Sequence, residues 1–120
     1  MKFNYWLDIA THKKIGNDKN VDVWTLIRYI GQLPLAFDII TLRYPDGSSL
    51  PEHRDVVKGF KCYRVNLCFN SGTGGEFVSE SYIFKSKYFN IFRPDINTHS
   101  VTKVVGGTRW MFSVGIGIKE

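Results

Sequence analysis

The chain of 120 residues lacks the features that mark several special classes of protein. Its two cysteines and four prolines are too few for a disulfide framework or a proline-rich linker. No apolar run approaches the roughly 18 residues of a membrane-spanning helix. The first ten residues include Lys2, Asn4 and Asp8, where a secretion signal would be apolar. Because so short a chain supports one core, the sequence predicts a single cytoplasmic domain over residues 1–120, without a membrane segment.

The chain also lacks a concentration of charge of one sign. Sixteen Lys and Arg residues against eleven Asp and Glu residues give a net charge of +5, spread along the sequence. No basic run would follow a phosphate backbone, so acidic partners are favoured only weakly. A content of 43% hydrophobic and 15% aromatic residues predicts a folded globular protein.

Cys62 and Cys68 lie in one predicted strand. At about 3.3 Å per residue their α-carbons are about 20 Å apart, which is beyond the reach of a disulfide. Neither belongs to a close pair of cysteines or of cysteine and histidine. Both are therefore predicted to be reduced thiols, and a structural zinc site is not expected.

Before residue 36 the patterns predict one strand and one helix. Apolar side chains alternate over residues 3–9, which is the period of a half-buried strand, and residues 16–20 form a turn cluster. Apolar residues at positions 23, 24, 27 and 30 share one helical face. A short helix is expected there, with Asp22 as its N-cap and Gly31 at its end.

From residue 36 onwards short β-rich runs alternate with turn signals. They cover residues 36–44, 62–69, 77–84, 88–92, 99–105 and 108–118. Runs of this length and density predict a mainly β protein, either a sandwich or a barrel. The domain would thus consist of an N-terminal strand and helix over residues 1–35 and a β core over residues 36–118.

Two of the three histidines are candidates for metal ligands. His12 stands beside two lysines before a turn and is predicted to be an ordinary surface histidine. His53 and Asp55 are two residues apart, so in an extended segment their side chains point to the same side. A chance His-x-Asp has a probability of roughly one in six in this composition, and the simpler reading is a hydrogen-bonded loop pair.

His99 follows Asp55 by 44 residues, and Arg109 stands ten residues further on. Two imidazoles and one carboxylate form the facial set of non-haem iron(II), which leaves three coordination positions open. A mononuclear zinc hydrolase could use the same ligands but would not require the guanidinium.

The order His53-x-Asp55, His99, Arg109 resembles that of the 2-oxoglutarate and iron(II) dependent dioxygenases, most closely their prolyl-hydroxylase branch. The resemblance extends over residues 36–118. It includes the segment of residues 44–47 at the usual distance before the first ligand, a hairpin at 70–77, and a Val-x-x-Gly-x-Arg turn at 104–109. It implies a double-stranded β-helix of the jelly-roll or cupin-like type, with iron held by His53, Asp55 and His99.

The resemblance also implies roles for residues around the metal. Arg109 would pair bidentately with the distal carboxylate of 2-oxoglutarate, because its planar fork fits a carboxylate. Ser113 would lie beside that carboxylate, Tyr44 would help to hold the co-substrate, and Asn66 would touch it. The simpler readings are a surface salt bridge for Arg109, strand filling for Ser113 and a core position for Tyr44.

The activity that the resemblance implies is hydroxylation with O2, accompanied by conversion of 2-oxoglutarate to succinate and CO2. A prolyl or other side chain of a peptide or protein is the first substrate class, and a nucleic-acid base is kept as an alternative. Two other classes stay open: a non-catalytic domain that binds metal or 2-oxoglutarate, and a cupin-like metal enzyme that uses no keto acid. The oligomeric state is not predicted.

Overall fold

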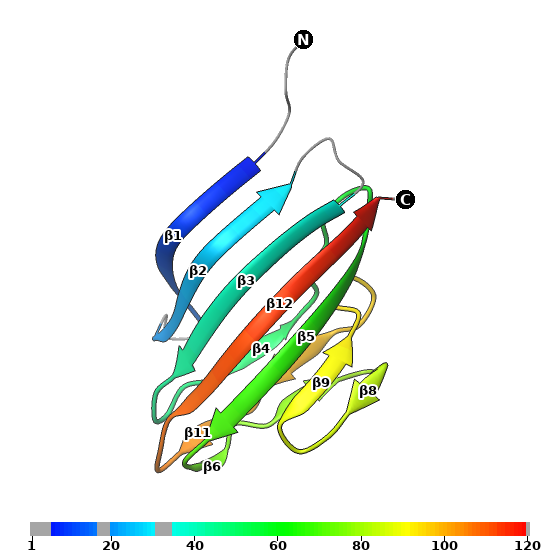
Figure 1. Ribbon diagram of the computed structural model, residues 1–120. Coiled ribbons are helices and arrows are strands. Elements are labelled where there is room, and N and C mark those ends of the chain that lie inside the picture. Colours follow the sequence, from blue (N-terminus) through cyan, green and yellow to red (C-terminus); the bar gives the residue numbers. More distant parts are fainter. Residues whose placement is uncertain (1–5, 17–19, 31–34, 120) are drawn as a thin grey trace.

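The computed structural model describes residues 6–16, 20–30 and 35–119, and these residues form strands and no helix. One sheet has seven strands in the order β1-β2-β3-β12-β5-β9-β8 (Figure 1). Their bounds are β1 (Trp6–Ile15), β2 (Val21–Ile30), β3 (Leu35–Tyr44), β12 (Arg109–Lys119), β5 (Phe60–Asn70), β9 (Phe89–Phe92) and β8 (Phe84–Lys85).

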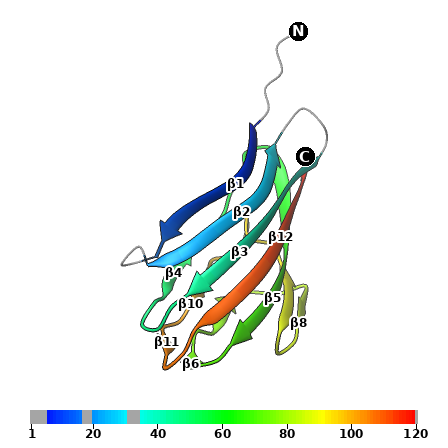
Figure 2. The same cartoon turned by 60° about the vertical axis from the view of Figure 1, so that its left-hand side comes forward.

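Behind this sheet lie two smaller ones (Figures 1 and 2). The three-stranded sheet has the order β4 (Leu50–His53), β10 (His99–Val101) and β7 (Phe77–Ser79). The two-stranded sheet pairs β11 (Val104–Val105) with β6 (Thr73–Gly74). All of these pairings are antiparallel.

The core fills the space between the large sheet and the small ones. Strand β12 shows how the sequence produces it, because its residues alternate strictly between buried and exposed from Arg109 to Ile118. The buried set of every second residue faces the small sheets, as the two-residue period of a strand requires. The main apolar cluster comprises Val21, Val23, Leu42, Tyr44, Val101, Val104 and Met111.

Most of the predicted β-rich runs correspond to strands. The runs at 36–44, 62–69, 88–92 and 108–118 match β3, β5, β9 and β12 within two residues. The runs at 77–84 and 99–105 are each divided into two short strands, β7 with β8 and β10 with β11. Cys62 and Cys68 are both free, as predicted. Across the described residues there is no helix with the length and hydropathy of a membrane span.

The predicted helix at 23–30 is wrong, because these residues belong to strand β2. The pairing of β2 with β3 shifts by one residue between Thr25 and Ile27, which marks a β-bulge. The bulge changes which residues face inward, so Val23 pairs with Leu42 inside while Ile27 pairs with Ile39 outside. The spacing that imitates a helix therefore arises from a bulge in a segment of mainly β-branched and aromatic residues.

The predicted N-terminal strand is only partly confirmed. Positions 3 and 5 lie outside the described residues, and β1 continues past residue 9 to Ile15. Ala10 has a φ of 54°, and it lies opposite the bulged Leu26 of β2. The alternation of residues 3–9 is interrupted there, which is why it could not reveal the second half of the strand. Gly31, the predicted helix end, also lies outside the described residues.

Candidate metal centre

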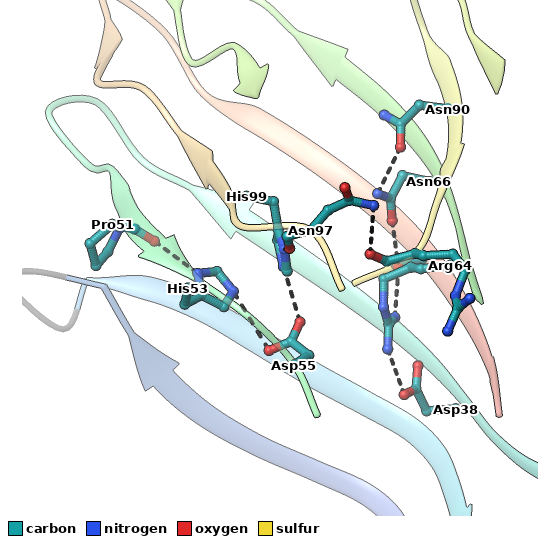
Figure 3. Close-up of polar contacts among 11 residues, drawn as sticks. Asp38, Pro51, His53, Asp55, Arg64, Asn66, Asn90, Asn97 and His99 are labelled. Atoms are coloured by element: carbon teal, nitrogen blue, oxygen red, sulfur yellow. Dashed lines mark hydrogen bonds and ion pairs between the residues drawn. The ribbon is translucent and has the colours of Figure 1, made fainter. Parts of the chain in front are cut away.

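His53, Asp55 and His99 come together between the sheets. His53 ends β4 and pairs directly with His99, the first residue of β10. Asp55 follows two residues after His53 and is fixed by a hydrogen bond from its backbone N–H to the carbonyl of Pro94, at 2.9 Å. One potential ligand atom from each of the three residues lies within 4.8 Å of the others (Figure 3).

The distances within this cluster fit a shared ion. Asp55 Oδ2 is 3.1 Å from His99 Nε2, and Asp55 Oδ1 is 3.6 Å from His53 Nε2. Ligand atoms at about 2.1 Å from an octahedral ion are about 3 Å apart when they occupy neighbouring positions. The arrangement therefore needs only small adjustments to hold a metal on one face.

The orientation of both imidazole rings is set by backbone carbonyls. The Nδ1 atom of His53 lies 2.8 Å from the carbonyl oxygen of Pro51, and that of His99 lies 3.0 Å from the carbonyl of Asn97 (Figure 3). Because a carbonyl can only accept, each Nδ1 carries the hydrogen. The Nε2 atoms of both rings face the carboxylate of Asp55, and this contact is favourable when Nε2 carries a second hydrogen or when a cation lies between ring and carboxylate.

The three ligands differ in exposure. The side chain of His99 is 5% exposed and packs against the rings of Phe77 and Phe92, whereas that of Asp55 is 51% exposed. Burial opposes ionisation of Asp55, but the hydrogen bond with His99 and the charges of His53 and His99 hold its pKa below the ordinary value. Asp55 is thus a carboxylate at neutral pH, as a metal ligand must be.

A cavity of about 220 Å³ adjoins the cluster. Its wall includes the three ligands together with Tyr44, Asn66 and Met111. Tyr44 is 0% exposed, and its hydroxyl is buried without a hydrogen-bond partner among the described residues. Burial, opposed by Arg109, raises the pKa of Tyr44 to about 12, so the hydroxyl stays protonated and can donate. A buried donor without a partner is costly, and it therefore indicates a place for an acceptor.

Arg109 is 2% exposed and belongs to the inward row of β12. Its guanidinium lies 4.9 Å from the centre of the Tyr44 ring and contacts the sulfur atoms of Cys68 and Met111. It forms no ion pair with an acidic residue in the described part of the chain. It lines a second hollow of about 520 Å³, whereas Tyr44 and Met111 line the cavity beside the cluster.

Ser113 and Asn66 are also inward and fully buried, at 1% and 0% exposure. Ser113 Oγ donates to Asn66 Oδ1 at 2.6 Å and accepts from Arg64 Nη1 at 2.7 Å, while Asn66 Nδ2 donates to Asn90 (Figure 3). Ser113 is four residues along the strand from Arg109, or about 13 Å. In this structure Ser113 is engaged with Arg64 and Asn66, and its place beside the carboxylate of a bound co-substrate stays a prediction.

Sequence patterns provided no functional indication for Asp38, which lines the cavity of about 220 Å³, or for Asn90, which lines the second hollow. Asp38 Oδ2 accepts from Arg64 Nη2 at 2.7 Å, and the pair lies over Gly115, where an added Cβ would come within 2.5 Å of Nη2. Asp38 Oδ1 is buried without a hydrogen-bond partner among the described residues. The alternation of β3 could have revealed Asp38, because it lies an even number of residues from Leu42 and Tyr44 and therefore points to the same inward side.

We expect Ser113→Ala to lower the free energy of unfolding by about 1–3 kcal/mol. The change leaves Arg64 Nη1 and Asn66 Oδ1 buried without their partner, and an unpaired buried polar group costs about that much. Urea unfolding followed by circular dichroism measures it. Ser86→Ala, at an exposed serine, is the control and should change stability by less than about 0.5 kcal/mol. Equal stability of the two variants would contradict the role given to this network.

No family model matches the chain, and no curated protein matches it. Solved structures do. A prolyl-4-hydroxylase from Pseudomonas putida superposes with a TM-score of 0.52 and 17% identity, over 71% of this chain and 52% of that one. A predicted oxalate decarboxylase from Thermotoga maritima superposes with a TM-score of 0.50 and 17% identity, over 92% and 94%.

A further match is the complex of Rhodobacter sphaeroides SigE with the anti-sigma ChrR, with a TM-score of 0.52, 16% identity, and coverage of 89% of this chain and 48% of that one. The fold is cupin-like. Together with the sheets described above, these matches confirm the predicted double-stranded β-helix. At such identities the likeness shows the fold alone, and the chain spans about half the length of the hydroxylase and of the anti-sigma match.

In this cupin-like fold His53 and His99 belong to the three-stranded sheet, and Asp55 belongs to the segment after β4. Arg109 and Tyr44 belong to the large sheet. Antiparallel pairing aligns Arg109 with Tyr44 on neighbouring strands, and both side chains are buried on the inward face of the large sheet. The cluster of His53, Asp55 and His99 thus has the geometry and the donor atoms that could hold a metal ion.

Proposed function

We propose that this protein is a 2-oxoglutarate and iron(II) dependent dioxygenase that hydroxylates a side chain of a peptide or protein. The observation that carries the proposal is a pair of unsatisfied buried groups in the core that also contains the candidate metal cluster. Arg109 is a buried guanidinium without a carboxylate partner, and Tyr44 carries a buried hydroxyl without an acceptor, both statements applying to the described residues.

A buried charge without a counterion costs several kcal/mol, so a fold keeps one only where something compensates for it. A carboxylate would satisfy both groups, since it can accept from the guanidinium and from the hydroxyl together. A keto acid with a second carboxylate would reach this position while its other end binds the metal. Met111 lies between the cavity and Arg109, and its unbranched side chain can turn aside to admit such a molecule.

The donor set favours iron over zinc. Two imidazoles and one carboxylate leave three positions of an octahedron free, as a bidentate keto acid and O2 require. When bound, iron(II) would supply the activation of O2. The protein's own residues would do the rest: His53, Asp55 and His99 would fix the ion, and Arg109 and Tyr44 would hold the co-substrate.

The substrate class follows from the accessibility of the site. His53 and Asp55 are 32% and 51% exposed at their side chains, so the ion would lie near the surface and not in a closed pocket. A side chain on a peptide or protein can reach such an ion, with prolyl as the first candidate because one structural neighbour is a prolyl-4-hydroxylase. A nucleic-acid base is the alternative that a substrate panel would separate.

The test is turnover of the co-substrate. Anaerobic protein with iron(II) and 2-oxoglutarate should develop a weak charge-transfer absorption in the visible range, and exposure to air with a panel of peptides should then release succinate. The absorption without succinate on any peptide or oligonucleotide would indicate a non-catalytic binding domain. Metal binding without the absorption would indicate a cupin-like metal protein that uses no keto acid, and the proposal would fail.

A further inference from the structure

The outward face of the large sheet is apolar and bare. Strands β3, β12 and β5 are neighbours, and their pairing places nine large apolar side chains on the side away from the small sheets. These residues, called the outer face from here on, are Phe37, Ile39, Leu67, Phe69, Trp110, Phe112, Val114, Ile116 and Ile118. No other described element lies over these strands in either ribbon view (Figures 1 and 2).

The exposure of these side chains is large for a single protein chain. Each is between 38% exposed, for Ile39, and 50% exposed, for Phe112. Large apolar side chains have areas of about 150–250 Å². The outer face therefore presents on the order of 700 Å² of contiguous apolar surface, whereas the largest patch on a typical monomer is about 300–600 Å². Surface of this extent indicates an interface.

Charge on this side is confined to the margins. On the outward positions of β3, β12 and β5 the charged residues are Arg43 and Lys61, which lie beside Trp110 and opposite Ile118, at the two ends of the strands. Arg43 is already paired with Asp22 on the neighbouring strand, at 2.6 Å. An apolar centre with a charged margin is the pattern of a protein interface. A nucleic acid or an acidic protein would need a positive patch here, and the centre of the face offers none.

We propose that the outer face binds the outer face of a second copy of this chain, giving a two-fold symmetric dimer in which two large sheets pack face to face. Sheets pack in this way at about 10 Å, with side chains of the two faces interdigitated. A standard interface buries about 800 Å² on each partner, close to what the outer face offers. A two-fold symmetric pair is also a closed assembly, because each copy uses its whole outer face and leaves no apolar surface for a third copy.

The dimer would keep the two metal centres independent. The ligands lie on β4, β10 and the segment after β4, behind the large sheet, while the outer face is on its opposite side. The proposed interface therefore does not depend on the identity of the metal or on catalysis. Because each copy carries a net charge of +5, we also expect the dimer to tighten as salt screens the repulsion between copies.

Sedimentation velocity of the metal-free protein at several concentrations tests the proposal. We expect a single species of twice 13.8 kDa at micromolar concentration. Phe112→Lys, in the centre of the outer face, should reduce the mass to that of one chain. Phe112→Gln should weaken the dimer at least tenfold without adding charge, which covers the case in which the lysine variant does not fold. Val56→Lys is the matched control, since Val56 is 70% exposed and belongs to none of the three strands that carry the outer face, and it should stay dimeric.

Three results would overturn the proposal: a monomeric wild type, a polydisperse aggregate, or a dimer that survives both substitutions at Phe112. A monomer that binds a hydrophobic dye would show that the outer face is free in solution. Its partner would then be another protein or a further segment of a longer chain. A dimer lost in the Phe112 variants and retained in Val56→Lys, with the circular dichroism of a β protein in each, would establish the interface.

Discussion

His99→Leu is expected to lose divalent metal binding while the fold is retained. His99 is one of the three proposed ligands, and removal of a direct ligand should lower the affinity for the metal at least 100-fold, because loss of an outer partner alone costs 10–100-fold. Leucine keeps the volume that packs against Phe77 and Phe92, which an alanine would leave as a cavity. Asp55→Ala should lose the metal equally, and since that side chain is half exposed, it should change stability little.

Anaerobic titration with iron(II), or with Mn(II) as a redox-stable probe, measures this as a stoichiometry near one in the wild type and near zero in both variants. His12→Gln is the matched control, because His12 contacts Asp22 and Trp24 and does not line the cavity beside the cluster, so it should not affect the metal. Thermal unfolding supplies a second readout. Added metal should raise the melting temperature of the wild type alone, since a ligand that binds only the folded state stabilises it. Retained stoichiometry in both ligand variants would contradict the assignment of the site.

Arg109→Met should abolish succinate release and yet leave the protein more stable. The guanidinium would contribute two charge-assisted hydrogen bonds to the co-substrate, so its loss should weaken 2-oxoglutarate binding about 100-fold or more. In the unliganded protein the same guanidinium is a buried charge without a carboxylate partner among the described residues. Its replacement by an apolar side chain of similar length should raise the free energy of unfolding by about 1–3 kcal/mol.

A variant that gains stability and loses activity has lost a residue that binds a ligand, because loss of a structural residue would lower stability. Isothermal titration with 2-oxoglutarate in the presence of Mn(II), together with urea unfolding, would measure both effects. Arg109→Lys keeps the charge but loses the planar fork, so it should weaken binding less than methionine does. Arg54→Met, at an exposed arginine, controls for the change in net charge. Unchanged affinity for 2-oxoglutarate in Arg109→Met would favour a cupin-like metal protein that uses no keto acid.

The metal cluster could be predicted from spacing, because its chemistry is carried by few residues. His53 and Asp55 are close in the chain, and the family resemblance supplied His99 and Arg109 at their distances. What the sequence could not supply was the orientation of the rings. The carbonyls of Pro51 and Asn97 that hold the two Nδ1 atoms are backbone groups, and any residue type provides such a carbonyl. Only the folded chain shows that both are present.

The strand pattern was readable wherever the alternation was uninterrupted, as in β3, β5 and β12. It failed at Ala10 and Leu26, where a bulge reversed the alternation and apolar residues acquired a helical spacing. A bulge depends on how one strand pairs with its neighbour, so a pattern confined to one segment cannot reveal it. The same limit applies to Ser113. Its inward position follows from the alternation of β12, but its hydrogen-bond partner Arg64 is 49 residues away and cannot be recognised from that strand.

The sequence by itself determined the β class, the inward row of β12 and the identity of the candidate ligands, because these depend on local alternation and on residue chemistry. Tertiary structure decided which inward groups meet and which surface is left bare. The same alternation that buries Arg109 and Ser113 exposes Trp110 and Phe112, and only the placement of the small sheets fixes which side is the core. A row of apolar side chains belongs to the core or to an interface according to which element packs against it. The sequence of one strand alone does not contain that information.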